Sequence, residues 1–226
     1  DFAPLEIVLG SIQAVREFKI PVVLVGDKEQ ILTILKNNHE ENNPLIEIHH
    51  ASEVIEMGEH PGLAYRKKKD ASVSVGARLV RAKECGALVA PGSTGAAVTA
   101  GLLGIGRIKG IERPAILSPI PNEKGRYTYL IDSGASAQPK VETYVQNAIL
   151  GYIYASKVAG IKNPRIGLLN IGEEDTKGSP LVTEANKVLQ NQSIIPFSGN
   201  AEGRDIMTGE FDVVVTDGFT GNVVLK

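Results

Sequence analysis

The sequence has a single cysteine, a small net charge and no apolar run typical of a membrane span. A single cysteine, Cys85, excludes an internal disulfide and favours a reducing, cytoplasmic setting. We expect its thiol to be a buried packing residue rather than a nucleophile. A net charge of −2 over 226 residues gives no reason to expect a nucleic acid partner. The uncharged stretch from Gly86 to Gly106 contains Pro91 and several glycines, which are not typical of a spanning helix.

Common motifs of covalent and metal catalysis are also missing. The chain has no Ser-His-Asp order, no G-x-S-x-G elbow, no Walker motif and no paired metal carboxylates. Its histidines, at 39, 49, 50 and 60, match no metal-site spacing, so we expect no metal. These absences favour chemistry by positioning and electrostatics, without a covalent enzyme intermediate.

Short apolar runs alternate along the chain with helical patterns. We predict helices over 4–18, 28–37, 71–85, 96–105, 139–159 and 180–189, the second of them capped by Asp27. We predict strands over 20–26, 45–49, 87–90, 113–118, 127–131, 165–170, 194–197 and 212–216, with a polar loop over 198–205. This alternation indicates one α/β domain over 1–226, a three-layer α/β/α sandwich around a mostly parallel sheet. We also expect sequence to be missing at both ends.

Two turns with the pattern G-x-T-G-x-x-V follow apolar runs. The unpaired N–H groups of a helix that begins at such a turn suit an anion, and two such turns suggest phosphoryl-group chemistry. The alternative is that the glycines only ease packing. The candidate phosphate-binding residues in the two turns are Gly92, Ser93, Thr94, Gly95, Gly218, Thr220 and Gly221.

Further polar candidates follow other predicted strands. Because the carboxyl ends of parallel strands share one edge of a sheet, these loops should converge there. Lys177 could set an ammonium against phosphate or an oxyanion, and Arg204 could bind phosphate through its guanidinium fork. Asn222 could donate to a developing oxyanion, and Asp217 could orient Lys177 or Arg204 by a salt bridge. The alternative for each is a surface charge or a helix cap.

One basic cluster stands out, formed by Arg66, Lys67, Lys68 and Lys69. It is either a solvated helix face or a docking surface for an acidic partner. The predicted helix over 139–159 has more apolar surface than the core-facing side of an amphipathic helix requires. It could line an apolar groove or a subunit contact.

Three long motifs together resemble a known family. The segments 170–178, 197–205 and 212–222 are similar to those of the PlsX phosphate acyltransferases of bacterial phospholipid synthesis, and the resemblance extends upstream through the turn at 92–96 and the basic cluster. It implies a fold like that of phosphotransacetylases and isopropylmalate dehydrogenases. It also implies that the protein is a homodimer and uses no cofactor. It further implies a cytoplasmic protein that touches the membrane peripherally.

The family's reaction converts acyl-ACP (acyl carrier protein) and phosphate to acyl phosphate and ACP, and a membrane glycerol-3-phosphate acyltransferase uses the product. The resemblance therefore implies that Lys177 and Asn222 are catalytic. From the residues of the loops themselves we expect the two turns and Arg204 to bind phosphate and the basic cluster to dock ACP. Apolar residues would shelter the acyl chain, among them Leu102, Leu103, Ile149 and Ile153. Two alternatives stay open: a phosphotransacetylase-like transferase of short acyl-CoA, and a non-catalytic phosphate- or nucleotide-binding module.

Overall fold

The computed structural model describes residues 2–226, and their contacts gather into two units, 1–108 and 109–226. The single domain expected from the sequence stays a prediction, and each unit is described by itself. None of the helices in the described residues combines the length and the apolar character needed to span a bilayer.

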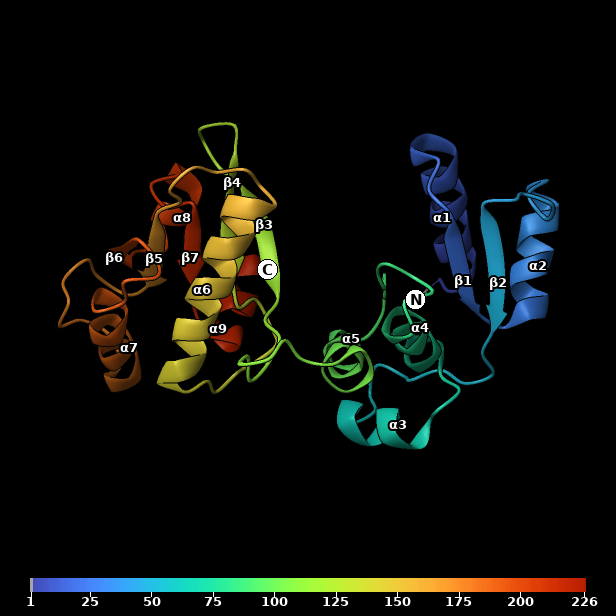
Figure 1. Cartoon of the computed structure of the whole chain (residues 1–226), viewed down its shortest axis with the longest axis horizontal. Coiled ribbons are helices and arrows are strands. Elements are labelled where there is room, and N and C mark those ends of the chain that lie inside the picture. The colour runs from blue at the N-terminus through green and yellow to red at the C-terminus, as the bar shows by residue number, and fades with distance from the viewer. Residues whose placement is uncertain (1) are drawn as a thin grey trace. The chain divides into compact units, whose positions relative to one another are not determined.

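The first unit is built on a parallel pair of strands, β1 (Val22–Gly26) and β2 (Ile46–His50). Helices α1 (Leu5–Phe18) and α2 (Lys28–Asn37) cover one face, where Val8, Ile12 and Leu35 are buried around Leu24. Helix α4 (Ser72–Arg81) covers the other face, since the alternate strand residues Val23 and Val25 pack with its apolar side chains and with Cys85. The remaining helices are α3 (Pro61–Lys67), α5 (Thr94–Thr99) and a π-helical turn, η1 (Ala100–Ile105) (Figure 1).

The second unit holds a five-stranded sheet in the order β3-β4-β7-β5-β6. Strand β3 (Leu117–Pro121) pairs antiparallel with β4 (Tyr127–Ile131). The strands β5 (Ile166–Leu169), β6 (Phe197–Ala201) and β7 (Val213–Val215) complete the sheet with parallel pairings. The α/β class and the mostly parallel sheet predicted from the sequence are therefore confirmed.

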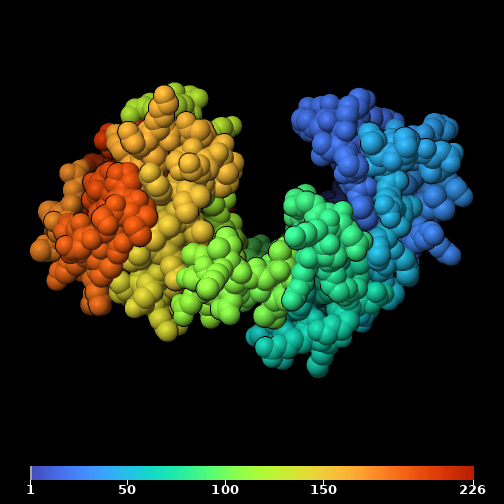
Figure 2. Space-filling model, in the orientation of Figure 1, coloured from blue at the N-terminus to red at the C-terminus, as the bar shows by residue number. Residues whose placement is uncertain are grey.

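Helices lie on both faces of this sheet. Side chains at alternate positions, such as Ile131, Leu168 and Val213, pack against α6 (Val141–Lys157) and α7 (Pro180–Gln190). The intervening residues Leu130 and Val214 form a second core with the short helix α8 (Asp205–Thr208) and its surroundings. The last helix, α9 (Gly218–Leu225), follows β7. In the space-filling view the yellow and orange residues, which include those of α6 and α7, make up much of the visible surface of the second unit (Figure 2).

Three predicted strands are wrong in place or in kind. Residues 87–90 form no strand, because Leu88 packs on α4 and the next residue, Val89, is 86% exposed. The strand predicted over 113–118 lies at 117–121 because Asn122 Oδ1 accepts from the backbone N–H groups of Lys124 and Arg126, which fixes the hairpin turn and its register.

The strand predicted over 194–197 instead runs from Phe197 to Ala201, so half of the polar loop predicted over 198–205 is a strand. Its register with β5 shifts between the pairs Ile166–Phe197 and Leu168–Asn200. The positive φ of Gly199, 100°, lies at this irregularity. The apolar pattern did not indicate this strand because its residues are largely polar. Asn200, for example, is buried through hydrogen bonds rather than through apolar contacts.

Candidate functional site

A cleft of about 760 Å³ lies at the carboxyl ends of the parallel strands in the second unit. Leu169 and Asn170 reach it from the end of β5, and Thr216 and Asp217 reach it from the end of β7. Its other walls come from the segment before α6, the start of α7 and helix α9. This is the edge where open α/β sheets bind ligands, and a volume of this size suits a small-molecule site.

Lys177 lies in the loop between β5 and α7, one residue before the cleft residues Gly178 and Ser179. Asn170 fixes this loop, since its Nδ2 donates to Lys177 O at 2.9 Å while its Oδ1 accepts from Ile171 N at 2.8 Å. Thr183 Oγ1 also donates to Lys177 O, at 3.2 Å. The carbonyl oxygen of Lys177 is therefore held by two side chains, and the exposed lysine side chain projects from a defined position.

A buried amide pair holds the first half of the same loop. Asn186 on α7 donates from Nδ2 to Asn200 Oδ1 at 2.8 Å, and Asn200 Nδ2 donates to Glu174 O at 2.9 Å. Both asparagine side chains are buried, and the hydrogen bond between them is made away from water. Asn200 on β6 thus fixes the loop at Glu174, and Asn186 on α7 holds the Asn200 side chain in place.

The turn at the start of α9 is packed closely against the segment that follows β4. A Cβ on Gly218 would lie 2.7 Å from Ser136 N, and a Cβ on Gly221 would lie 2.9 Å from the carbonyl carbon of Asp132. Three N–H groups of the turn also have acceptors: Gly218 donates to Ser136 O, Thr220 to Asp217 Oδ1 and Gly221 to Asp217 O. These contacts support the packing interpretation of the two glycines, and phosphate binding by Gly218, Thr220 and Gly221 stays a prediction.

Asp217 caps α9 instead of pairing with a cation. Its Oδ1 accepts from Thr220 N at 2.8 Å and its Oδ2 from Thr220 Oγ1 at 2.7 Å. The buried hydroxyl of Tyr144, from α6, adjoins the same carboxylate. Burial, followed by the charge of Asp217 and a hydrogen bond with it, raises the pKa of Tyr144 well above its usual range. The Asp217 carboxylate and the Tyr144 hydroxyl thus form a polar pair among the residues that line the cleft.

Asn222 and Arg204 each have partners in the protein. Asn222 Nδ2 donates to Ser133 O at 3.3 Å, which ties α9 to the segment after β4. The Arg204 guanidinium lies 2.9 Å from Glu202 and 3.5 Å from Glu173, and its side chain is 70% exposed. The catalytic role of Asn222 and the phosphate-binding role of Arg204 stay predictions, and a bound phosphate would compete with carboxylates for Arg204.

The first turn, Gly92–Gly95, lies in the first unit. Ser93 caps α5, its Oγ accepting from Ala96 N at 3.3 Å. A Cβ on Gly95 would lie 2.5 Å from Pro61 Cγ, so this glycine lets α5 pack closely on α3. The local geometry thus explains Ser93 and Gly95 through capping and packing, and phosphate binding by this turn stays a prediction.

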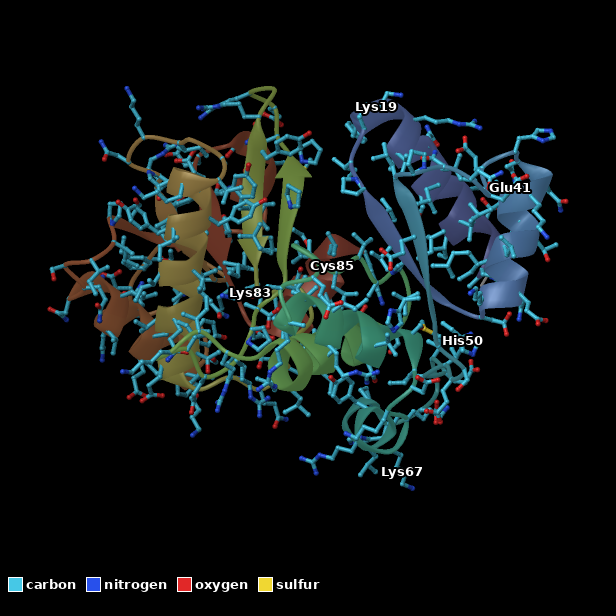
Figure 3. All side chains as sticks on the ribbon, turned by 45° about the vertical axis from the view of Figure 1, so that its right-hand side comes forward. Lys19, Glu41, His50, Lys67, Lys83 and Cys85 are labelled. Carbon is cyan, nitrogen blue, oxygen red and sulfur yellow. The ribbon has the colours of Figure 1, made fainter. Side chains whose placement is uncertain are left out.

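The basic cluster forms the end of α3 and the residues after it. Arg66, Lys67 and Lys69 are exposed, and Figure 3 shows Lys67 pointing away from the helix. Lys68 instead forms a 2.6 Å ion pair with Glu59 and donates to Val54 O at 2.7 Å. This leaves three of the four predicted docking side chains exposed.

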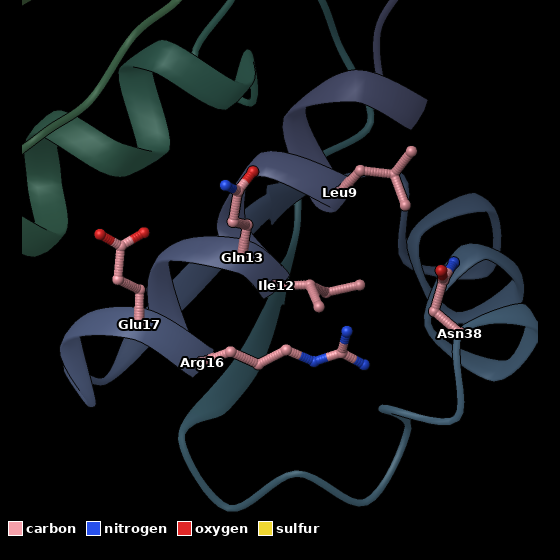
Figure 4. Close-up of a pocket in the computed structure, with 6 residues that line it drawn as sticks. All are labelled: Leu9, Ile12, Gln13, Arg16, Glu17 and Asn38. Atoms are coloured by element: carbon pink, nitrogen blue, oxygen red, sulfur yellow. The ribbon is translucent and has the colours of Figure 1, made fainter.

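A second hollow lies on the first unit between α1 and the end of α2 (Figure 4). It is lined by Leu9, Ile12, Gln13, Arg16, Glu17 and Asn38. Arg16 donates from Nε to Glu40 Oε1 at 2.7 Å, so its charge is used within the unit. We assign no chemistry to this hollow.

The sequence analysis missed the residues that shape the cleft. Asn170 belongs to a motif that carried the family resemblance, but nothing local shows that its side chain holds a loop seven residues away. Tyr144 lies within a helical apolar pattern, where an aromatic residue is usually core. One usable signal was the asparagine directly after an apolar strand, at the strand end where ligand and loop contacts gather.

The mostly parallel sheet with helices on both faces is an α/β fold similar to that of phosphotransacetylases. Over 98% of this chain and 77% of the other, the structure matches a phosphotransacetylase from Streptococcus pyogenes with a TM-score of 0.70 and 15% identity. The predicted likeness to phosphotransacetylases is therefore confirmed at the level of the fold.

Sequence comparison identifies the family. The model of the family described as "Fatty acid synthesis protein" matches residues 1–226, and the chain belongs to this family. It is 50% identical over 226 residues to a phosphate acyltransferase of Pelotomaculum thermopropionicum and 49% identical to that of Aquifex aeolicus. Each match covers all of this chain and, respectively, 65% and 66% of the relative. The chain thus spans about two thirds of the length of these curated relatives.

Proposed function

We propose that the protein transfers a fatty acyl group from acyl-ACP to inorganic phosphate and so supplies acyl phosphate for phospholipid synthesis. Membership in a fatty acid synthesis family and identity of about half to proteins named phosphate acyltransferase support this proposal. The observation that carries it is the Lys177 loop, which hydrogen bonds from Asn170 and Asn200 hold beside a cleft at the strand ends.

In the proposed reaction a phosphate oxygen bonds to the thioester carbonyl carbon, and a tetrahedral oxyanion forms. The carbon–sulfur bond then breaks and the carrier leaves as a thiolate. The Lys177 ammonium stabilises the oxyanion. Asn222 Nδ2 carries two N–H groups, so one can donate to the oxyanion while the other keeps its bond to Ser133 O. Arg204 is the proposed phosphate contact of the second unit. Phosphate binding by Gly92–Gly95 and by Gly218–Gly221 is a separate proposal for each turn, and in the second turn it requires the N–H groups of Gly218, Thr220 and Gly221 to exchange acceptors.

The decisive test offers the protein phosphate with either acyl-ACP or short acyl-CoA and traps acyl phosphate as its hydroxamate. We expect hydroxamate from a long-chain acyl-ACP. Turnover with short acyl-CoA alone would favour a phosphotransacetylase-like transferase, to which the fold is equally suited. Saturable phosphate binding without turnover of any donor would instead indicate a binding module.

We further propose that the exposed residues Arg66, Lys67 and Lys69 receive the acidic carrier. Replacing all three by glutamate should raise the KM for acyl-ACP about tenfold at low salt, because like charges then repel the carrier, and kcat should change little. The same replacements at Lys19, Lys36 and Lys162 serve as the control for net charge. An unchanged KM for acyl-ACP, measured as a function of ionic strength, would place the docking surface elsewhere.

The family resemblance also supports a homodimer, a cytoplasmic protein with peripheral membrane contact, and use of its product by a membrane glycerol-3-phosphate acyltransferase. Sedimentation at several protein concentrations tests the first of these proposals.

A further inference from the structure

We infer that the cleft of the second unit holds the acyl chain of the thioester substrate, an inference that rests on the proposed acyl transfer. Hydrocarbon side chains from four separate segments line it. They come from the segment before α6, the end of β5, the first turn of α7 and helix α9: Pro139, Leu169, Leu181, Val182, Phe219 and Val224. Convergence of apolar side chains on one concave surface is what an alkyl chain requires.

The charges of the cleft point to the same ligand. Among the described residues that line it there is no lysine, arginine or histidine, and Asp217 is the one carboxylate. Both Asp217 oxygens accept hydrogen bonds from Thr220. A nucleotide with several phosphates would meet no cationic side chain on these walls, whereas an alkyl chain needs none. The walls therefore suit the fatty part of a thioester better than the nucleotide part of CoA.

Two large apolar side chains on the cleft are open to water. Ile171 is 83% exposed and Phe219 is 66% exposed, and they follow β5 and β7 respectively. An acyl chain that covers them removes apolar surface from water, which favours binding. The residues first expected to shelter the chain do not line this cleft: Leu102 and Leu103 belong to the first unit, and Ile149 packs against the core of the second.

The position of the lysine loop relates the chain to the chemistry. Gly178 and Ser179 line the cleft and directly follow Lys177, whose carbonyl is fixed by Asn170 and Thr183. We place the carbonyl end of the acyl chain at this part of the cleft, beside the proposed catalytic lysine. Cleft length then limits how long an acyl chain can be sheltered, so this cleft sets chain-length preference.

The experiment fills the cleft and measures chain-length preference. Val182→Phe and Val224→Phe add aromatic bulk to the cleft from α7 and α9 respectively, and Val224 is 38% exposed. Lys187→Phe adds the same ring at an exposed position of α7 and is the matched control. Acyl phosphate formation is measured with octanoyl-, dodecanoyl- and hexadecanoyl-ACP, and circular dichroism verifies that each variant folds.

We expect each cleft variant to lower kcat/KM for hexadecanoyl-ACP about tenfold or more relative to octanoyl-ACP, because methylenes excluded from the cleft lose their burial. The control variant should keep the chain-length profile of the unmodified protein. Folded cleft variants with an unchanged profile would overturn the inference and leave the proposed function intact. If the unmodified protein turns over no acyl-ACP at all, the proposed function fails, and this inference fails with it.

Discussion

Gly221→Ala is expected to lower the free energy of unfolding by about 3 kcal/mol, although alanine usually stabilises a helix relative to glycine. The added Cβ would collide with the carbonyl oxygen of Asp132 and lie 2.9 Å from Thr216 Cγ2. The segment after β4 cannot easily yield, because Asp132 is buried and its carboxylate accepts from Ile116 N, Gly134 N, Ala135 N and Ser136 N at 2.8–3.1 Å. Denaturant-induced unfolding measures the change.

Gly10→Ala is the matched control for this prediction. Gly10 also lies inside a helix, α1, but a Cβ there would meet no atom within 4 Å. It should therefore stabilise its unit by about 0.5–1 kcal/mol, the ordinary difference in helix propensity. If the two alanines have the same sign of effect, the close approach of α9 to Asp132 does not explain the glycine in the second G-x-T-G turn.

Lys177→Met is expected to lower kcat for acyl phosphate formation about 100-fold, because it removes the ammonium proposed to stabilise the oxyanion. Methionine keeps the aliphatic part of the lysine side chain, which lies close to Gly172: Lys177 Cγ is 3.3 Å from the place a Cβ on Gly172 would take. Because that contact is kept, the loop should keep its conformation. Asn170, Thr183 and Asn200 hold that loop through backbone atoms, which the substitution leaves unchanged. Steady-state kinetics with acyl-ACP and phosphate measures kcat and both KM values separately.

Lys187→Met removes a lysine from an exposed position on α7 and should leave kcat within about twofold, since exposed charges away from the site contribute little. A Lys177→Met variant with normal kcat and a raised KM for phosphate would make the lysine a phosphate ligand instead. Normal kcat with both KM values unchanged would remove Lys177 from the proposed mechanism.

Local patterns predicted most of the elements because they depend on residues within a turn or two of one another. The helix predicted over 4–18 lies at Leu5–Phe18, and Asp27 caps α2 through Gln30 N at 2.9 Å, as its position before a helical pattern indicated. The strand over 127–131 was placed without error. Patterns failed where burial was polar, as in β6, and where an apolar run, 87–90, has no neighbouring strand among the described residues to pair with.

The candidate site was predicted in part. The loops after β5, β6 and β7 do end at one edge of the second unit, as parallel strand order requires. The partners of the individual side chains were not predicted: Asp217 bonds to Thr220 rather than to a lysine or arginine, and Arg204 lies among carboxylates. The hydrogen-bond partner of each polar side chain depends on how the elements pack. The order and spacing of residue types along the chain do not specify that partner.

By itself, the sequence determined the α/β class and most helices and strands, because propensity, capping and apolar periodicity act over short stretches of chain. It also indicated the family, through the resemblance of the segments 170–178, 197–205 and 212–222 to known proteins. Only the tertiary structure decided why Gly218 and Gly221 are glycines, what fixes the Lys177 loop, and where an apolar cleft lies. Those features come from pairs far apart in the chain, such as Asn222 and Ser133, or Asn200 and Glu174. Folding brings such residues into contact, and the chemistry of the site depends on distances of a few ångströms that no local pattern specifies.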